Sequence, residues 1–198
     1  YTKSGFNVCP GATAGCISSC LDESGRGQWT EKNGFINPIH KARLNRTLYF
    51  FNERAAFLEQ LEKEIKRGIK WSKKRGLTPV FRLNGTSDIR WENFGIIQKF
   101  SDIQFYDYTK LYNRRNLPRN YHLTFSRAES NQKQTLNAVV NGLNIAAVFR
   151  TALPKTYLGL KVINGDKHDL RFLDPARACV GLIAKGKAKN DQSGFVIN

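Results

Sequence analysis

The sequence lacks any long apolar run. No stretch of its 198 residues approaches the roughly 20 apolar residues that a helix needs to cross a bilayer. We therefore expect no membrane-spanning segment and no membrane partner. No signal peptide is visible, and because the sequence opens at Tyr1 without a Met, nothing about a leader is inferred from its start. We expect a cytoplasmic protein with reduced cysteines.

Several motifs of well-known enzyme classes are also missing. The sequence contains no P-loop, no Rossmann glycine fingerprint, no HExxH metal motif and no G-x-S-x-G nucleophile elbow. It also has no C-x-x-C pair, the usual knuckle of structural zinc sites. Internal repeats and low-complexity linkers are absent, so we expect one domain over residues 1–198.

Acidic residues are few. Asp and Glu number 16 against 32 Lys and Arg, which gives a formal charge of +16. Such a field attracts polyanions, of which nucleic acid is the most common in a cell. A hydrophobic content of 40% and an aromatic content of 12% indicate a globular chain with a real core. We expect nucleic acid as a partner; the sequence gives no oligomeric state.

Apolar spacing predicts an α/β fold. Residues 1–46 are rich in glycine and read as a loop region, and a helical stripe runs over 47–75. Amphipathic stretches at 90–100 and 131–143 predict further helices. Short apolar runs predict strands at 79–83, 103–108, 121–125, 145–149, 158–163 and 179–184. Strands separated by helices indicate an incomplete (β/α) barrel or an open, curved, mostly parallel sheet over 47–198.

Three of the four cysteines are clustered. Cys9, Cys16 and Cys20 form a C-x6-C-x3-C pattern, and the residues between them are small. Thiolates suit zinc or iron–sulfur clusters, and three local cysteines can hold a [4Fe–4S] cluster with one iron left open. Two alternatives stay open: zinc, with His40 or Cys179 completing the ligands, and inert thiols or a disulfide. Cys179 lies in an apolar strand and reads as a small buried hydrophobe.

Polar residues follow the predicted strands. Because the carboxyl ends of parallel strands meet at one edge of a sheet, these residues predict a pocket there. Its expected lining is Asn84, Gly85, Thr86, Asp88, Lys110, Arg150, Asp166 and Asp169. The segment around His168 and Arg171 reads as a polar turn, and His122 as a packed histidine. A metal-dependent nuclease that uses Asp88, Asp166 and Asp169 is a further hypothesis, which requires these acids to converge.

Sequence pieces in order along the chain resemble the "gene product eighty-eight"-like family of phage and prophage proteins. They are NVCPGATAGCISSC at 7–20, GRGQ at 25–28, RLNGTSDIRWE at 82–92, QFYDYTK at 104–110, YHLTFS at 121–126, AAVFR at 146–150 and GDKHDLRFLDP at 165–175. This family resembles trimmed radical S-adenosylmethionine (SAM) enzymes. The resemblance implies a host-cytoplasmic iron–sulfur protein with Cys9, Cys16 and Cys20 as ligands.

The same resemblance implies SAM as a further cofactor, with the turn at 84–86 near its amino group. The cysteine spacing departs from the C-x3-C-x2-C of radical SAM enzymes, and the acid of the turn comes late, at Asp88. The alternative function is a non-catalytic nucleic-acid-binding protein with a structural zinc or iron–sulfur site. In that case the basic surface would carry the binding, and the helix end at 66–75 and the tail LIAKGKAK at 182–189 are its candidate phosphate-binding segments.

Overall fold

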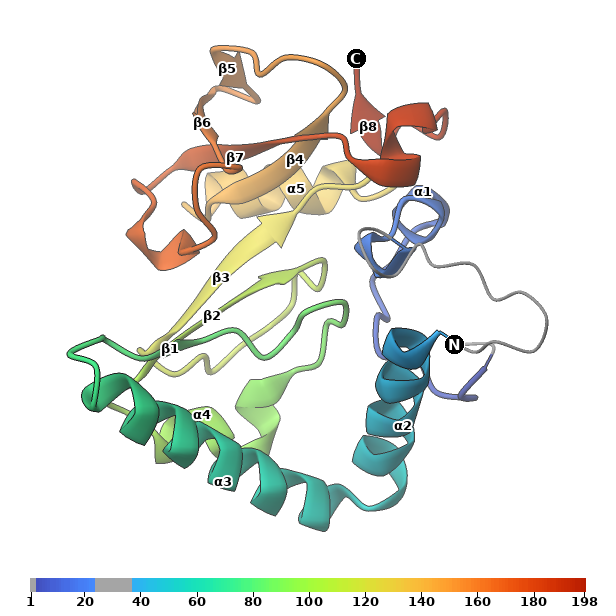
Figure 1. The fold of residues 1–198 in the computed structure, drawn as a ribbon. Helices are drawn as coiled ribbons and strands as arrows, with labels where there is room; N and C mark the ends of the chain where they lie inside the picture. Colours follow the sequence, from blue (N-terminus) through green and yellow to red (C-terminus); the bar gives the residue numbers. More distant parts are fainter. Residues whose placement is uncertain (1–2, 24–36) are drawn as a thin grey trace.

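The computed structural model describes residues 3–23 and 37–198, and the GRGQ segment lies outside them (Figure 1). Its centre is an eight-stranded sheet in the order β1-β2-β3-β4-β7-β6-β5, with β8 paired to β4. The strands are β1 (Val80–Phe81), β2 (Gln104–Thr109), β3 (Tyr121–Ser126), β4 (Ile145–Phe149), β5 (Thr156–Tyr157), β6 (Leu160–Asn164), β7 (Ala178–Ile183) and β8 (Val196–Ile197).

All neighbouring strands are parallel except β5 and β6, which form an antiparallel pair. The sheet begins at β1 and ends at β5, so it is open. The prediction of an open, mostly parallel sheet is confirmed, whereas a barrel is not formed. Strands β6 and β7 are parallel although only a short 3-10 turn, η4 (Arg171–Leu173), lies between them.

The helices are α1 (Ala14–Ser18), α2 (Pro38–Asn52), α3 (Arg54–Lys73), α4 (Ile96–Lys99) and α5 (Gln132–Val140), and the remaining 3-10 turns are η1 (Leu21–Glu23), η3 (Trp91–Phe94) and η5 (Gly186–Asn190). The buried apolar residues form three clusters, and the smallest lies around Ala184 and Val196 near the C-terminal end of the chain. The other two follow one another along the strands. Phe105 and Leu123 pack with α3, α4 and η3, whereas Phe125 and Ile145 pack with α5.

The helix predicted over 47–75 is wrong in its bounds. Two helices, α2 and α3, occupy the region, and they meet at Glu53, whose φ of −131° and ψ of 49° are not helical. Helix α2 begins at Pro38, within the predicted loop, because Asn37 caps it by accepting a hydrogen bond from the Ile39 amide at 3.0 Å. The apolar spacing runs through the bend, so periodicity alone does not reveal it.

The bend brings aromatic residues from both helices onto one indole. The ring centroids of Phe50 and Phe57 lie 5.6 Å and 6.4 Å from that of Trp91. These contacts fix the corner of α2 and α3 against η3, beside the carboxyl end of β1 (Figure 1). Within the described residues, no helix is both long enough and apolar enough to cross a membrane.

Candidate metal centre at the carboxyl edge of the sheet

The three clustered cysteines lie on residues 7–20, which we call the cysteine loop. Its backbone pairs with the turn after β1: the Asp88 amide donates to the Val8 carbonyl at 2.7 Å. The Cys9 thiol donates to the Thr86 carbonyl at 3.2 Å. These bonds attach the loop to the carboxyl edge of the sheet, where ligand sites of open α/β folds are found.

A second anchor is Glu129, which follows strand β3. Its two carboxylate oxygens accept hydrogen bonds from the Thr13 hydroxyl and the Gly15 amide, each at 2.7 Å. Burial would raise the pKa of Glu129, but these hydrogen bonds outweigh it and hold the pKa below its ordinary value. Thr13 also caps α1 by accepting from the Cys16 amide at 3.2 Å. The start of α1 is therefore held to the sheet.

Two glycines let the cysteine loop approach the sheet closely. A Cβ atom at Gly11 would lie 2.8 Å from Cβ of Lys110, and one at Gly15 would lie 2.7 Å from Cβ of Phe195. Both distances are shorter than any ordinary carbon–carbon contact, so only glycine fits at either position without a shift of the neighbours. The glycines that the sequence places between the cysteines thus have a packing role.

The cysteines are free thiols, so the disulfide alternative is not supported by the structure. Burial, together with the neighbouring Cys20, Asp88 and Cys16, raises the pKa of Cys9 to about 11, while Lys110 acts in the opposite direction. Burial and Cys16 likewise raise the pKa of Cys20. The three thiols are therefore within electrostatic reach of one another.

The donor chemistry fits a thiolate-bound metal, but the site is not closed. Cys9, Cys16 and Cys20 are half-buried and come from one loop with two anchors. Across residues 3–23 and 37–198, no group of three or more His, Cys, Asp or Glu side chains is arranged to hold a metal ion. The sulfurs would have to draw together around a metal; of the three cysteines, only Cys16 lies within a helix, α1.

Cys179 and His40 were the predicted alternatives for a fourth ligand. Cys179 lies at the centre of the sheet on β7, fully buried, and burial alone raises its pKa to about 12. It is the small buried hydrophobe that the sequence favoured. His40 Nε2 lies 3.4 Å from the Asp22 carbonyl, and the Asp22 amide donates to the Cys20 sulfur at 3.4 Å. His40 therefore lies near the cysteine loop and Cys179 does not.

The turn after β1 is committed to internal hydrogen bonds. Asn84 is buried, and its side chain bonds to Asp107, Ser87, Ile89 and Trp91. Asp88 is also buried and accepts from the Thr109 hydroxyl and the Lys110 amide at 2.8 Å and 2.7 Å. Burial raises the pKa of Asp88 despite these bonds. Both residues shape the edge of the sheet, and Asp88 also lines a cavity beside the cysteine loop.

Gly85, Thr86 and Lys110 lie nearer to open space. A Cβ at Gly85 would meet no atom within 4 Å. Lys110 Nζ donates to the Ser126 hydroxyl at 2.9 Å and lies 5.7 Å from the Phe195 ring centroid. The Lys110 charge lowers the pKa of both Cys9 and Cys20, so it favours their thiolates. Among the predicted pocket residues, Thr86, Asp88 and Lys110 therefore surround Cys9.

The other three predicted pocket residues belong to separate interactions. Arg150 bonds to Asn198 and to the carbonyls of Lys189 and Asp191, and so ties the C-terminal segment to β4. Asp166 pairs with Lys185 at 2.5 Å. Asp169 pairs with Arg82 at 2.7 Å. Each of the three thus has a charged or backbone partner of its own. The partner of Asp169, Arg82, also donates to the Asn84 and Gly85 carbonyls, so Asp169 lies beside the turn after β1. A mouth shared by all the predicted residues stays a prediction.

The same partners argue against the nuclease hypothesis. The carboxylates of Asp88, Asp166 and Asp169 accept from three different sets of donors. No trio of acids arranged for a metal ion occurs in the part of the chain that the structure describes. Around His168, Asp166 and Asp169 pair with Lys185 and Arg82 and not with Lys167 or Arg171, the partners expected of a polar turn. Arg171 is fully buried and donates to the His168 carbonyl.

A buried ionic network beneath the edge was not predicted. Arg114 donates to Glu92 through Nε at 2.9 Å and lies 3.6 Å from Asp88. Tyr121 donates to Asp107 at 2.7 Å and accepts from Arg114 at 3.1 Å. Burial raises the pKa of Asp107 to about 6. Isolated charges in strand and loop patterns gave no sign of this network, because its members are brought together only by the fold.

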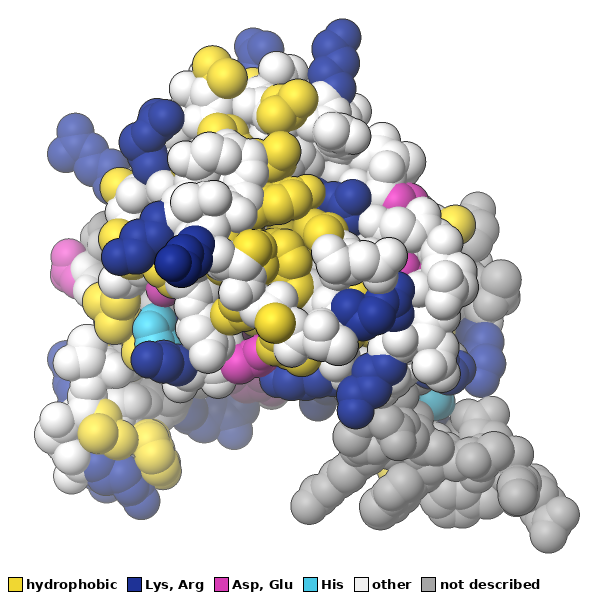
Figure 2. Space-filling view, turned by 90° about the horizontal axis from the view of Figure 1, so that it is seen from above, with side chains coloured by type: hydrophobic (Ala, Val, Ile, Leu, Met, Phe, Trp, Pro, Cys, Tyr) yellow, Lys and Arg dark blue, Asp and Glu magenta, His cyan; other side chains and the backbone are white. Residues whose placement is uncertain are grey.

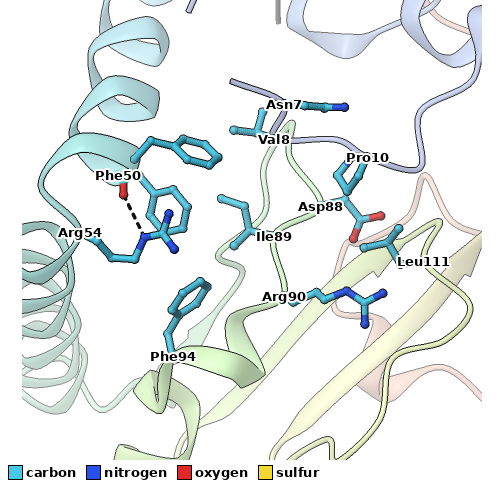
Figure 3. Close-up of a pocket in the computed structure, with 11 residues that line it drawn as sticks. Asn7, Val8, Pro10, Phe50, Arg54, Asp88, Ile89, Arg90, Phe94 and Leu111 are labelled. Atoms are coloured by element: carbon cyan, nitrogen blue, oxygen red, sulfur yellow. Dashed lines mark hydrogen bonds between the residues drawn. The ribbon is translucent and has the colours of Figure 1, made fainter. Parts of the chain in front are cut away.

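A pocket of about 210 Å³ adjoins the cysteine loop. Figure 3 shows Asn7, Val8 and Pro10 of the loop on one side and the α2–α3 corner on the other. The Arg54 guanidinium lies 4.3 Å from the Phe50 ring centroid and points into the space, and its Nε donates to the Phe50 carbonyl at 3.2 Å. The pocket is mainly apolar, and Arg54 gives it a cationic wall. Two of its lining residues, Val8 and Pro10, flank Cys9 in the sequence.

Comparison with known proteins gives a family but no activity. No curated protein and no solved structure matches the chain. The likeness to radical SAM enzymes consequently has no support from these comparisons. A family model described as "Gene product 88" matches residues 1–198, which include every segment that carried the resemblance. The chain belongs to the Gene product 88 family.

Proposed function

We propose that this protein holds an iron–sulfur cluster through Cys9, Cys16 and Cys20. The observation that carries the proposal is the placement of three free thiols on one loop that is anchored at the carboxyl edge of the sheet. The thiols are near enough to influence one another electrostatically. Thiolates are the ligands that such clusters prefer, and the Lys110 charge offsets part of the negative charge that they would carry.

Three protein ligands leave one iron of a [4Fe–4S] cluster open to a small molecule. The pocket beside Val8 and Pro10 gives such a molecule a place next to the cysteine loop. When bound, the cluster would supply one-electron chemistry. The chain's own contribution is to hold the loop through Glu129 and Asp88, and to limit water access by half-burying the thiols.

The test is anaerobic purification followed by iron, sulfide and zinc analysis. We expect a brown protein with iron and sulfide in equal amounts, and near-complete loss of both in Cys9→Ser, Cys16→Ser and Cys20→Ser. Cys179→Ala is the matched control, because Cys179 is buried in the sheet and should leave iron content unchanged. A colourless protein with one zinc per chain would overturn the iron–sulfur assignment in favour of the zinc alternative with His40.

Electron paramagnetic resonance of the reduced protein tests the open iron. The resemblance to radical SAM enzymes motivates adding SAM to this sample. A changed spectrum would support SAM as a ligand of the cluster. An unchanged spectrum would contradict that part of the proposal and leave a centre for electron transfer or for structure.

A further inference from the structure

A second surface lies at the other end of strand β1, away from the cysteine loop. It comprises the last two turns of α3, residues 66–75, and the segment 77–81 that enters β1; we call it the α3–β1 groove (Figure 1). The groove has a volume of about 340 Å³ and is lined by Gly68, Trp71, Ser72, Leu77, Thr78, Pro79, Val80 and Phe81. This volume is at the lower end of the roughly 300–1,000 Å³ of small-ligand sites.

The shape of the groove follows from the end of the helix. Gly76 has a φ of +64°, and its amide donates to the Lys73 carbonyl at 3.2 Å. The Leu77 amide then reaches back to the Ser72 carbonyl at 3.0 Å. This is the Schellman pattern of helix ends, which turns the chain back beside the helix. Leu77 is consequently held near Trp71, and each is 52% exposed.

The floor of the groove is aromatic. A Cβ at Gly68 would lie 3.0 Å from the Phe81 ring, so the ring packs directly against the helix backbone. Above it, the Arg75 guanidinium lies 4.1 Å from the Trp71 ring centroid and donates to the Trp71 carbonyl at 3.4 Å. Trp71 is half-exposed although Arg75 covers part of it, so the indole remains accessible to a planar ligand.

The segment that forms the groove carries basic side chains and no acidic ones. Residues 65–87 contain no Asp or Glu, and Lys70, Lys73 and Lys74 are exposed. The ion pairs of α3 in the described structure involve Lys63 and Lys66 with carboxylates nearer its start. None joins Lys70, Lys73 or Lys74 to a described carboxylate. Figure 2, which looks onto the molecule from the end opposite α3, shows that Lys and Arg are also spread widely there and that few acids lie among them.

We propose that the α3–β1 groove binds single-stranded nucleic acid, with a base stacked on Trp71 and phosphates paired with Lys70, Lys73 and Lys74. Aromatic rings stack on bases of any sequence, and lysines track the backbone, which is how non-specific single-strand binders work. A duplex fits less well, because its bases are stacked on one another and cannot reach the indole. The groove and the cysteine loop share no residue, so this inference stands independently of the proposed cluster.

The test is fluorescence anisotropy of a labelled, mixed-sequence, single-stranded oligonucleotide titrated with the full chain over a range of salt concentrations. Trp71→Ala should raise the Kd roughly tenfold, and Trp71→Phe should lie between it and wild type. Lys70→Glu, Lys73→Glu and Lys74→Glu combined should weaken binding by more than about tenfold. The slope of log Kd against log salt should fall by about 2, at about 0.7 per lost phosphate contact.

A second triple variant separates a local site from a general field. Lys133→Glu, Lys155→Glu and Lys161→Glu change the net charge equally at exposed positions away from the groove. We expect this control to weaken binding less than about threefold, which reflects long-range attraction alone. Equal effects of the two triples, unchanged binding by Trp71→Ala, or equal affinity for a duplex would each overturn the proposal. Circular dichroism of each variant confirms that it is folded.

Discussion

Charged side chains differ between the two ends of β1. They are buried and paired near the carboxyl ends of β1 and β2, and exposed at the amino end of β1. At the carboxyl ends, Asp88, Glu92 and Arg114 are buried and joined to one another beneath the cysteine loop. At the amino end, Lys70, Lys73 and Lys74 are exposed and have no ion pair with a described carboxylate. Buried charges must be paired to be tolerated, whereas exposed ones need no partner and remain available to a ligand.

Substitutions at the two ends of β1 should therefore affect different properties of the protein. Changes beneath the cysteine loop should alter stability and, through it, the position of the thiols. Changes in the α3–β1 groove should alter binding and leave stability almost untouched. Four variants test this contrast, in decreasing order of expected effect on the free energy of unfolding.

Glu92→Gln should have the largest effect. It removes the main partner of Arg114, whose side chain is 2% exposed. The buried Arg114 charge is then left with Asp88, 3.6 Å away, as its carboxylate partner. Breaking a buried pair from one side costs about 3–5 kcal/mol. Urea denaturation should show this loss. Glu64→Gln, an exposed change on α3, should keep the wild-type midpoint, and a similar midpoint for both variants would contradict the difference in burial.

Gly15→Ala should come next. The added Cβ would lie 2.7 Å from Cβ of Phe195, so either α1 or the C-terminal segment must move. Overpacking of this kind costs about 1–3 kcal/mol. Gly85→Ala is the control, since a Cβ there meets nothing within 4 Å. Thermal unfolding should distinguish the two, and the iron content of Gly15→Ala should also fall if the loop holds the cluster.

Asp107 should give a pH-dependent contribution. Its pKa is raised by burial to about 6, against 3.8 ordinarily, so the folded state binds its proton more tightly than the unfolded state. The contribution of Asp107 to stability therefore increases as the pH falls from 7 to 5, by about 1 kcal/mol, and is lost again as the pH rises through about 6.

The comparison for Asp107 is wild type against Asp107→Asn, with urea midpoints taken at pH 7 and pH 5. The urea midpoint of wild type should rise relative to that of the variant when the pH is lowered, since Asn cannot take up the proton. Asp102→Asn, at an exposed position, is the control. A gap between wild type and Asp107→Asn that stays constant with pH would show that Asp107 keeps one protonation state throughout.

Lys70→Glu should have the smallest effect on folding. Lys70 is exposed at the end of α3, and surface changes of this kind are usually within about 0.5 kcal/mol. Its Kd for a single-stranded oligonucleotide should nevertheless rise measurably. A large loss of stability in this variant would mean that the groove is a structural element, and the contrast between the two ends of the sheet would fail.

The sequence predicted the central strands well and the connections less well. The strand at 145–149 is found with the same bounds, β3 is one residue longer than predicted, and β2 and β7 are each shifted by one residue. The two-residue strands β5 and β8 were missed, because two residues are too few to show an alternation of apolar and polar side chains. The bend at Glu53 was missed for a related reason, since the apolar stripe is continuous across it.

The candidate site was predicted in part. The cysteine cluster and its neighbours Thr86, Asp88 and Lys110 meet at one edge, as strand order implies. Arg150, Asp166 and Asp169 follow strands too, but each finds a nearer partner. Position at a strand end can be read from the sequence, whereas the direction of a side chain depends on which opposite charge the fold brings within reach.

By itself the sequence determined the parallel sheet, the cationic character and the grouping of three cysteines, because hydrophobic period, charge and spacing are local properties of a chain. Only the tertiary structure decided that the cysteine loop docks through Glu129 and Asp88, that Cys179 lies apart from it, and that Trp71 stands beside a groove. Those outcomes depend on contacts between distant segments, which compete for the same hydrogen bonds and the same space and are resolved only when the whole chain packs.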